Sequence, residues 1–123
     1  MHGAHNYPFH KEHSDLDVPL NDGIADDEYL HLLTSHLTTI LQEVQPDFAF
    51  FLSGTDILST DKFGKLNISM QGCKQRDAIV FSMLQQQHIP CVTAMGGGYS
   101  ADVNIVVEAH CNTFRTALEV YNL

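Results

Sequence analysis

Two short apolar runs alternate with three longer amphipathic segments, and this alternation limits the possible folds of the chain more than any other feature. The runs cover residues 48–52 and 91–95, and helical periodicity covers about 26–44, 69–88 and 101–121. Strands that alternate with helices of this length are joined by right-handed crossovers, which place the strands in parallel. The pattern therefore predicts an α/β fold with the order helix, strand, helix, strand, helix, and strands buried on both faces.

Local signals predict where two of the helices begin and end. Asp26, Asp27 and Glu28 occupy the first turn of the first helix, where negative charge is favourable, and Pro46 closes that helix. Ser69 is the predicted N-cap of the second helix.

Residues 1–24 lack a sustained helical or strand period and contain four of the eight histidines. They are predicted to form an extended N-terminal arm with one short strand around residues 16–18, and residues 25–123 to form the α/β portion. The arm has no evident packing partner in the sequence. Its histidines, spaced by three, are expected to be solvated or packed in loops, because metal sites need ligands that are held in place.

Charge and cysteine content exclude several classes of function. Six Lys and Arg against fifteen Asp and Glu give a net charge of −9, so nucleic acid and anionic membranes are not expected as direct partners. No apolar stretch spans a bilayer, and no signal peptide is recognised. Three cysteines without paired spacing, Cys73, Cys91 and Cys111, favour reduced and buried thiols. These features predict an intracellular protein, cytoplasmic or, in a eukaryote, nuclear.

Ligands of open α/β sheets bind at the carboxyl ends of the strands, which directs attention to residues 53–61 and 96–100. Asp56, in the first loop, can ligate a metal, act as a base or cap a turn. The three glycines from Gly96 to Gly98 let the backbone approach a ligand and place the Tyr99 hydroxyl at the sheet edge, where it can donate to a developing oxyanion. The same segment formally fits GxGxxA, but the acidic strand end that a dinucleotide site requires is absent.

Four motifs, in this order, resemble the C-terminal part of the histone deacetylase family, especially its bacterial-type and class IV members. They are residues 1–9 (MHGAHNYPF), 14–20 (SDLDVPL), 53–56 (SGTD) and 96–99 (GGGY). The resemblance covers essentially the whole chain. It implies a three-layer, parallel-sheet arginase–deacetylase fold, of which this chain contains only the C-terminal portion.

The resemblance also implies roles for individual residues. Asp56 matches the second aspartate of the family's Asp-His-Asp zinc site, and Tyr99 matches the tyrosine that polarises the acyl carbonyl together with zinc. Tyr7 matches an aromatic wall of the acyl-lysine channel, and Gly97 and Gly98 match the backbone that lines this channel. The expected cofactor of the intact parent is Zn²⁺, and its expected substrate is an acyl-lysine peptide or a small acylated amine.

The chain departs from the family pattern because it has no Asp-x-His motif and no His-His pair. We therefore expect this chain alone to be inactive and to bind no zinc tightly, whereas its parent would hydrolyse linear amides. Two other hypotheses stay open. One is a non-catalytic interaction or dimerisation module that self-associates through an open sheet edge, and the other is a small nucleotide binder.

Overall fold

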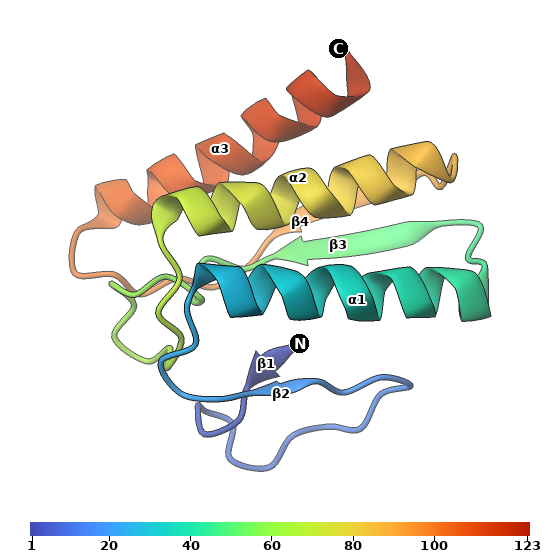
Figure 1. The fold of residues 1–123 in the computed structure, drawn as a ribbon. Helices are drawn as coiled ribbons and strands as arrows, with labels where there is room; N and C mark the ends of the chain where they lie inside the picture. The colour runs from blue at the N-terminus through green and yellow to red at the C-terminus, as the bar shows by residue number, and fades with distance from the viewer.

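The computed structural model describes residues 1–123 and has the predicted order of elements (Figure 1). Strands β3 and β4 pair in parallel, with Ala49 opposite Cys91 and Ser53 opposite Met95. The prediction of an α/β fold with parallel strands is thus confirmed. The helices are α1 (Asp26–Val44), α2 (Met70–Gln86) and α3 (Val103–Tyr121), and the strands are β1 (His2–Gly3), β2 (Pro19–Leu20), β3 (Ala49–Ser53) and β4 (Cys91–Met95).

Side-chain and backbone caps set the helix ends. The Ser69 hydroxyl accepts the Gly72 N–H at 2.9 Å, which confirms the predicted N-cap of α2. Helix α1 has the three predicted acidic residues in its first turn and ends at Gln45 in a left-handed conformation. Helix α3 begins slightly later than predicted, because the Asp102 carboxylate accepts the Asn104 N–H at 2.9 Å and caps the helix there.

The β3–β4 sheet is covered on one face. Helices α1 and α2 pack over that face, and their shared core contains Leu41, Val80, Leu84 and Ile89 against Ala49, Phe51 and Cys91. On the other face Phe50 and Leu52 are 84% and 69% exposed. The prediction that these strands are buried on both faces is therefore wrong. Successive strand residues point to opposite faces, and these helices cover only the face of Phe51.

The N-terminal arm folds back on itself and joins the core. Strand β1 pairs in parallel with β2, with His2 opposite Pro19 and Gly3 opposite Leu20. The strand expected around residues 16–18 thus lies slightly later in the chain. Val18, Leu20 and Ile24 of this region are buried in a second core cluster with Tyr29 of α1 and Cys73 of α2. The arm therefore has a packing partner that its sequence did not reveal.

Figure 1 shows the arm and its two strands on the far side of α1 from α2, and α3 packed beside α2. None of the three helices is both long and apolar enough to cross a membrane. All three cysteines are free thiols. Cys73 is buried, and Cys91 and Cys111 are partly buried.

Candidate active site

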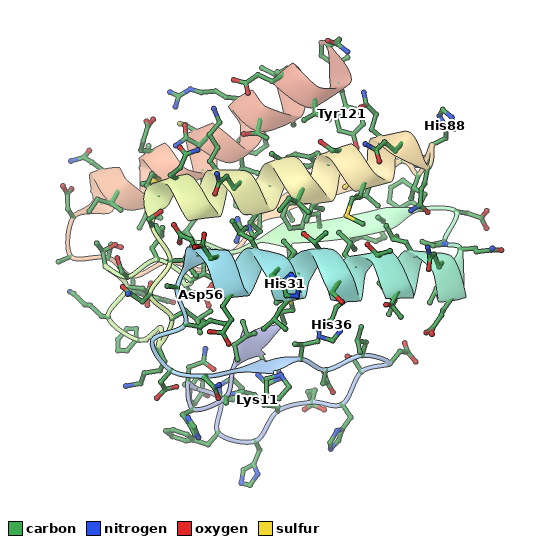
Figure 2. The ribbon with its side chains drawn as sticks, in the orientation of Figure 1. Lys11, His31, His36, Asp56, His88 and Tyr121 are labelled. Carbon is green, nitrogen blue, oxygen red and sulfur yellow. The ribbon has the colours of Figure 1, made fainter.

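The loops that leave the carboxyl ends of β3 and β4 are bonded to each other. The Thr55 N–H and the Thr55 hydroxyl both donate to the Gly97 carbonyl, at 2.8 and 2.9 Å. Thr55 is 1% exposed, so these hydrogen bonds are shielded from water. They place Asp56 of the first loop beside Gly97 and Tyr99 of the second. The two loops thus converge at one end of the sheet, where Figure 2 shows Asp56.

Glycines allow the two loops to approach closely. A Cβ on Gly98 would lie 2.0 Å from the Thr55 hydroxyl oxygen, and a Cβ on Gly96 would lie 2.6 Å from the Gly54 Cα. Within the first loop, a Cβ on Gly54 would lie 2.8 Å from an Asp56 carboxylate oxygen. The sequence suggested that the glycines make room for a ligand. In the structure, Gly96 and Gly98 make room for the neighbouring loop.

A cavity of about 490 Å³ opens between these loops and the N-terminal arm. Four of the five residues singled out from the sequence line it, namely Tyr7, Asp56, Gly97 and Tyr99. Gly98 does not line it and instead packs against Thr55. The remaining lining residues, which were not assigned to the site from the sequence, are Asn6, Asp61, Phe63 and Gly64.

Asp61 connects the two loops through its carboxylate. Its Oδ2 accepts the Tyr99 N–H at 2.6 Å, and its Oδ1 accepts the N–H groups of Phe63 and Gly64 at 2.9 and 2.7 Å. The Phe63 ring meets the Tyr99 ring edge to face, with centroids 5.2 Å apart. In the sequence, an aspartate followed by a glycine three residues later indicates a turn. This pattern does not indicate that the aspartate also bonds to Tyr99 on another loop.

Asp56 lines more than one cavity. The second, of about 350 Å³, extends inward between Met1, Tyr29 and the β3 residue Phe51. Partial burial raises the pKa of the Asp56 carboxyl above its usual value, and the nearby charge of Asp61 raises it further. The positive charge of Arg76 acts in the opposite direction but is the smaller influence.

Arg76 and Asp77 form a buried ion pair beneath the Asp56 turn. Arg76 Nε donates to Asp77 Oδ1 at 2.8 Å, and Arg76 Nη1 donates to the Gly54 carbonyl at 2.5 Å. The Thr113 hydroxyl of α3 donates to Asp77 Oδ2 at 2.7 Å. The pair therefore links α2, α3 and the loop after β3. A hydrophobic pattern assigns only apolar positions to the inner face of α2, so it missed both charged residues.

The residues of this chain do not by themselves complete a zinc site around Asp56. Catalytic zinc is typically held by three protein ligands, and no group of three His, Cys, Asp or Glu side chains is arranged to hold a metal. Of the cavities that Asp56 lines, the two larger ones have no His or Cys in their walls, and a third, of about 90 Å³, has His2 but no Cys. Figure 2 shows His88 at the opposite end of the sheet from Asp56. The Asp61 carboxylate already accepts three N–H groups.

The sequence of this chain is similar to that of a known protein family. A sequence model of the histone deacetylase domain matches residues 2–114. An uncharacterised protein of Picosynechococcus sp. is 36% identical over 121 residues, which are 98% of this chain and 40% of that protein. Histone deacetylase 2 of Arabidopsis thaliana is 32% identical over 122 residues, which are 96% of this chain and 32% of the relative.

A solved structure has a similar fold. The crystal structure of acetylpolyamine aminohydrolase from Burkholderia pseudomallei superposes with a TM-score of 0.72 at 15% identity, covering 85% of this chain and 29% of that one. The arginase–deacetylase fold predicted from the motifs is thus confirmed. The chain spans well under half the length of each of these proteins.

Proposed function

Because the chain belongs to the histone deacetylase family, we propose that it is the C-terminal segment of a zinc-dependent amidohydrolase that removes acyl groups from lysine or a similar amine. The observation that carries this proposal is the cavity that brings Tyr7, Asp56, Gly97 and Tyr99 together from three separate segments. Gly97 supplies backbone to its wall, and the two tyrosines and the carboxylate supply its chemical groups.

Tyr99 is proposed to stabilise the oxyanion of the reacting amide. Its side chain lines the cavity, is 60% exposed, and contacts the ring of Phe63. A phenol held at the cavity can donate a hydrogen bond to an acyl oxygen as negative charge develops there. The ring contact limits the positions of this hydroxyl before the substrate arrives.

Asp56 is proposed to contribute one carboxylate ligand to the zinc site, with the other ligands supplied by residues outside this chain. When bound, zinc acts as a Lewis acid and lowers the pKa of a bound water. Since residues 1–123 contain no Asp-x-His motif or His-His pair, we expect this chain alone to be inactive.

The chemistry of the cavity wall favours an acylated amine as substrate. Tyr7 and Phe63 offer aromatic surface to the aliphatic part of such a molecule, whose acylated nitrogen is a neutral amide. An acyl-lysine peptide and a small acylated amine share these features. We propose that Tyr7 of the N-terminal arm and Phe63 of the loop after β3 contact the aliphatic part of the substrate that carries the acyl group.

The coding sequence upstream of the Met1 codon gives a first test. We expect it to encode, in frame, an Asp-x-His motif and a His-His pair. In the protein expressed from that longer frame, Tyr99→Phe should lower turnover of an acetyl-lysine peptide about 100-fold or more while zinc content stays constant. Asp56→Ala should instead lose zinc, measured by metal analysis after dialysis.

Tyr121→Phe is the matched control, since Tyr121 ends α3 and does not line the cavity. It should change neither turnover nor zinc content. Unchanged turnover in Tyr99→Phe would refute the oxyanion role. Tight binding of one zinc per chain by residues 1–123 alone would show that this chain completes the metal site.

A non-catalytic interaction or dimerisation module is a second candidate, favoured by the open face of the β3–β4 sheet. Phe50, Leu52 and Val92 are exposed there, and β3 and β4 each pair along one edge only. If the upstream motifs are absent, sedimentation equilibrium should show self-association that Phe50→Ser with Leu52→Ser abolishes. A chain that stays monomeric at all concentrations would exclude dimerisation.

A further inference from the structure

We propose that Asp61 is a positioning residue that fixes Tyr99 at the cavity it shares with Asp56. The relevance of this role to catalysis rests on the proposed function, whereas the contacts themselves do not. Asp61 comes from the loop after β3, and Tyr99 comes from the loop after β4. The Asp61 carboxylate is therefore a bridge between the two loops that carry the candidate reactive groups.

Tyr99 has few other restraints. Its side chain is 60% exposed, so burial does not hold it. Its N–H donates to Asp61 Oδ2 at 2.6 Å, and its carbonyl accepts the Lys62 N–H at 3.3 Å. Both backbone polar groups of Tyr99 are thus bonded to two consecutive residues of the other loop. The Phe63 ring, from the same short segment, meets the Tyr99 ring edge to face.

The chemistry of a carboxylate suits this position. Three N–H groups, from Phe63, Gly64 and Tyr99, point at the two Asp61 oxygens. A carboxylate accepts on both oxygens, whereas the amide of asparagine accepts on one and donates from the other side. Hydrogen bonds from N–H groups to an ionised carboxylate are also stronger than those to a neutral acceptor. Asparagine would therefore direct an NH₂ group at one of these N–H groups.

These same bonds use three of the about four acceptor positions of the Asp61 carboxylate and leave little of it for a metal ion. Each oxygen already accepts at least one N–H group within 2.9 Å. Asp61 is thus assigned to hold the Tyr99 loop, and Asp56 remains the carboxylate available to the cavity.

Amide hydrogen exchange followed by NMR on the 123-residue chain tests the proposal without zinc or substrate. In the unmodified chain, the Tyr99, Phe63 and Gly64 amides should be protected although this region lies at the surface. In Asp61→Asn, exchange of the Tyr99 amide should accelerate about tenfold or more, while α2 amides keep their rates. The Tyr99 ring signal, assigned with Tyr99→Phe, should shift and lose its contact with Phe63.

Thr60→Ala is the matched control. The Thr60 hydroxyl lies 2.7 Å from the Ser100 hydroxyl and links the same two loops, and its hydrogen bond goes to Ser100 and not to Tyr99. This variant should leave the Tyr99 amide rate and ring signal close to those of the unmodified chain. An equal effect of Thr60→Ala and Asp61→Asn would overturn the proposal, because any link between the loops would then suffice. An unprotected Tyr99 amide in the unmodified chain would overturn it even if every Asp61 variant failed to fold.

In the longer protein, Asp61→Asn should lower kcat about tenfold or more with little change in KM and no loss of zinc. If Tyr99→Phe left turnover unchanged there, the proposed function would fail while the exchange result stood. If Asp61→Asn left kcat unchanged and Tyr99→Phe abolished it, the positioning role would fail by itself.

Discussion

Gly97 and Gly98 are adjacent residues of the loop after β4, but their surroundings differ. A Cβ on Gly98 would lie 2.0 Å from the Thr55 hydroxyl oxygen and 3.1 Å from Val106. A Cβ on Gly97 would meet only the Tyr99 ring, at 3.9 Å. Gly98→Ala should therefore lower the free energy of unfolding by about 1–3 kcal/mol, as overpacking does, measured by urea denaturation.

Gly97→Ala provides the control for this prediction at the residue scale. It should change the free energy of unfolding by less than about 1 kcal/mol, because ordinary contact distances are kept and the unfolded chain loses some entropy. Equal destabilisation by the two substitutions would mean that the loop tolerates no side chain at all. It would then refute the specific contact of Gly98 with Thr55.

At the scale of elements, helix α2 depends on its buried ion pair. Asp77 is fully buried and Arg76 is 4% exposed, and the pair bonds to Gly54 and Thr113 outside the helix. Asp77→Ala leaves a buried guanidinium without its counter-charge. It should lower the free energy of unfolding by about 3–5 kcal/mol, measured by chemical denaturation with circular dichroism.

Lys74, on the same helix, forms an exposed ion pair that can be compared with the buried pair. Its ammonium lies 3.6 Å from a Glu119 carboxylate oxygen at the surface, so Lys74→Ala should cost less than about 1 kcal/mol. The double replacement Arg76→Met with Asp77→Leu should recover much of the stability lost in Asp77→Ala, because no unpaired charge remains. A loss in Asp77→Ala as small as that in Lys74→Ala would contradict the buried character of the pair.

At the scale of the whole molecule, the folded chain should lose stability at alkaline pH. Burial raises the pKa of the Cys73 thiol above its ordinary value of 9.0 and that of the Tyr29 phenol above its ordinary value of 10.0. Above these ordinary values the unfolded chain has released protons that the folded chain still binds. The free energy of unfolding therefore falls as pH rises, by up to about 1.4 kcal/mol per pH unit for each group.

Urea denaturation between pH 8 and pH 10.5, roughly the range set by these ordinary values, checks the sign of this dependence. Tyr29→Phe keeps the ring and removes the ionisable hydroxyl, so its stability should fall less steeply at the alkaline end. A stability that stays constant or rises over this range would show that neither group is buried as described.

Much of the architecture could be predicted from local patterns. The helical periods and the two apolar runs located α1, β3, α2, β4 and α3, and the Ser69 cap was recognised by residue type. Burial of the strands was less predictable, because a run such as Phe48–Leu52 is equally apolar whether one or both faces are covered. The exposure of Phe50 depends on which neighbours pack against it.

The candidate site was predictable to a similar extent. Strand ends direct their loops to one edge of the sheet, so Asp56 and Tyr99 could be paired from topology, and the family resemblance added Tyr7. Asp61 could not be assigned, because its partner Tyr99 is 38 residues away and an aspartate in a loop most often bonds locally. The buried Arg76 was missed because a charged residue is expected at the surface.

The α/β class, the parallel pairing and the two loops that form the candidate site could be derived from the amino-acid sequence, because they follow from periodicity, handedness and residue type. Three contacts became visible only in the folded chain: Gly98 packs against Thr55, Asp61 accepts the Tyr99 N–H, and the N-terminal arm completes a core with α1 and α2. These are contacts between segments distant in the chain. They depend on how close two backbones come in space, and no local pattern of residues records that distance.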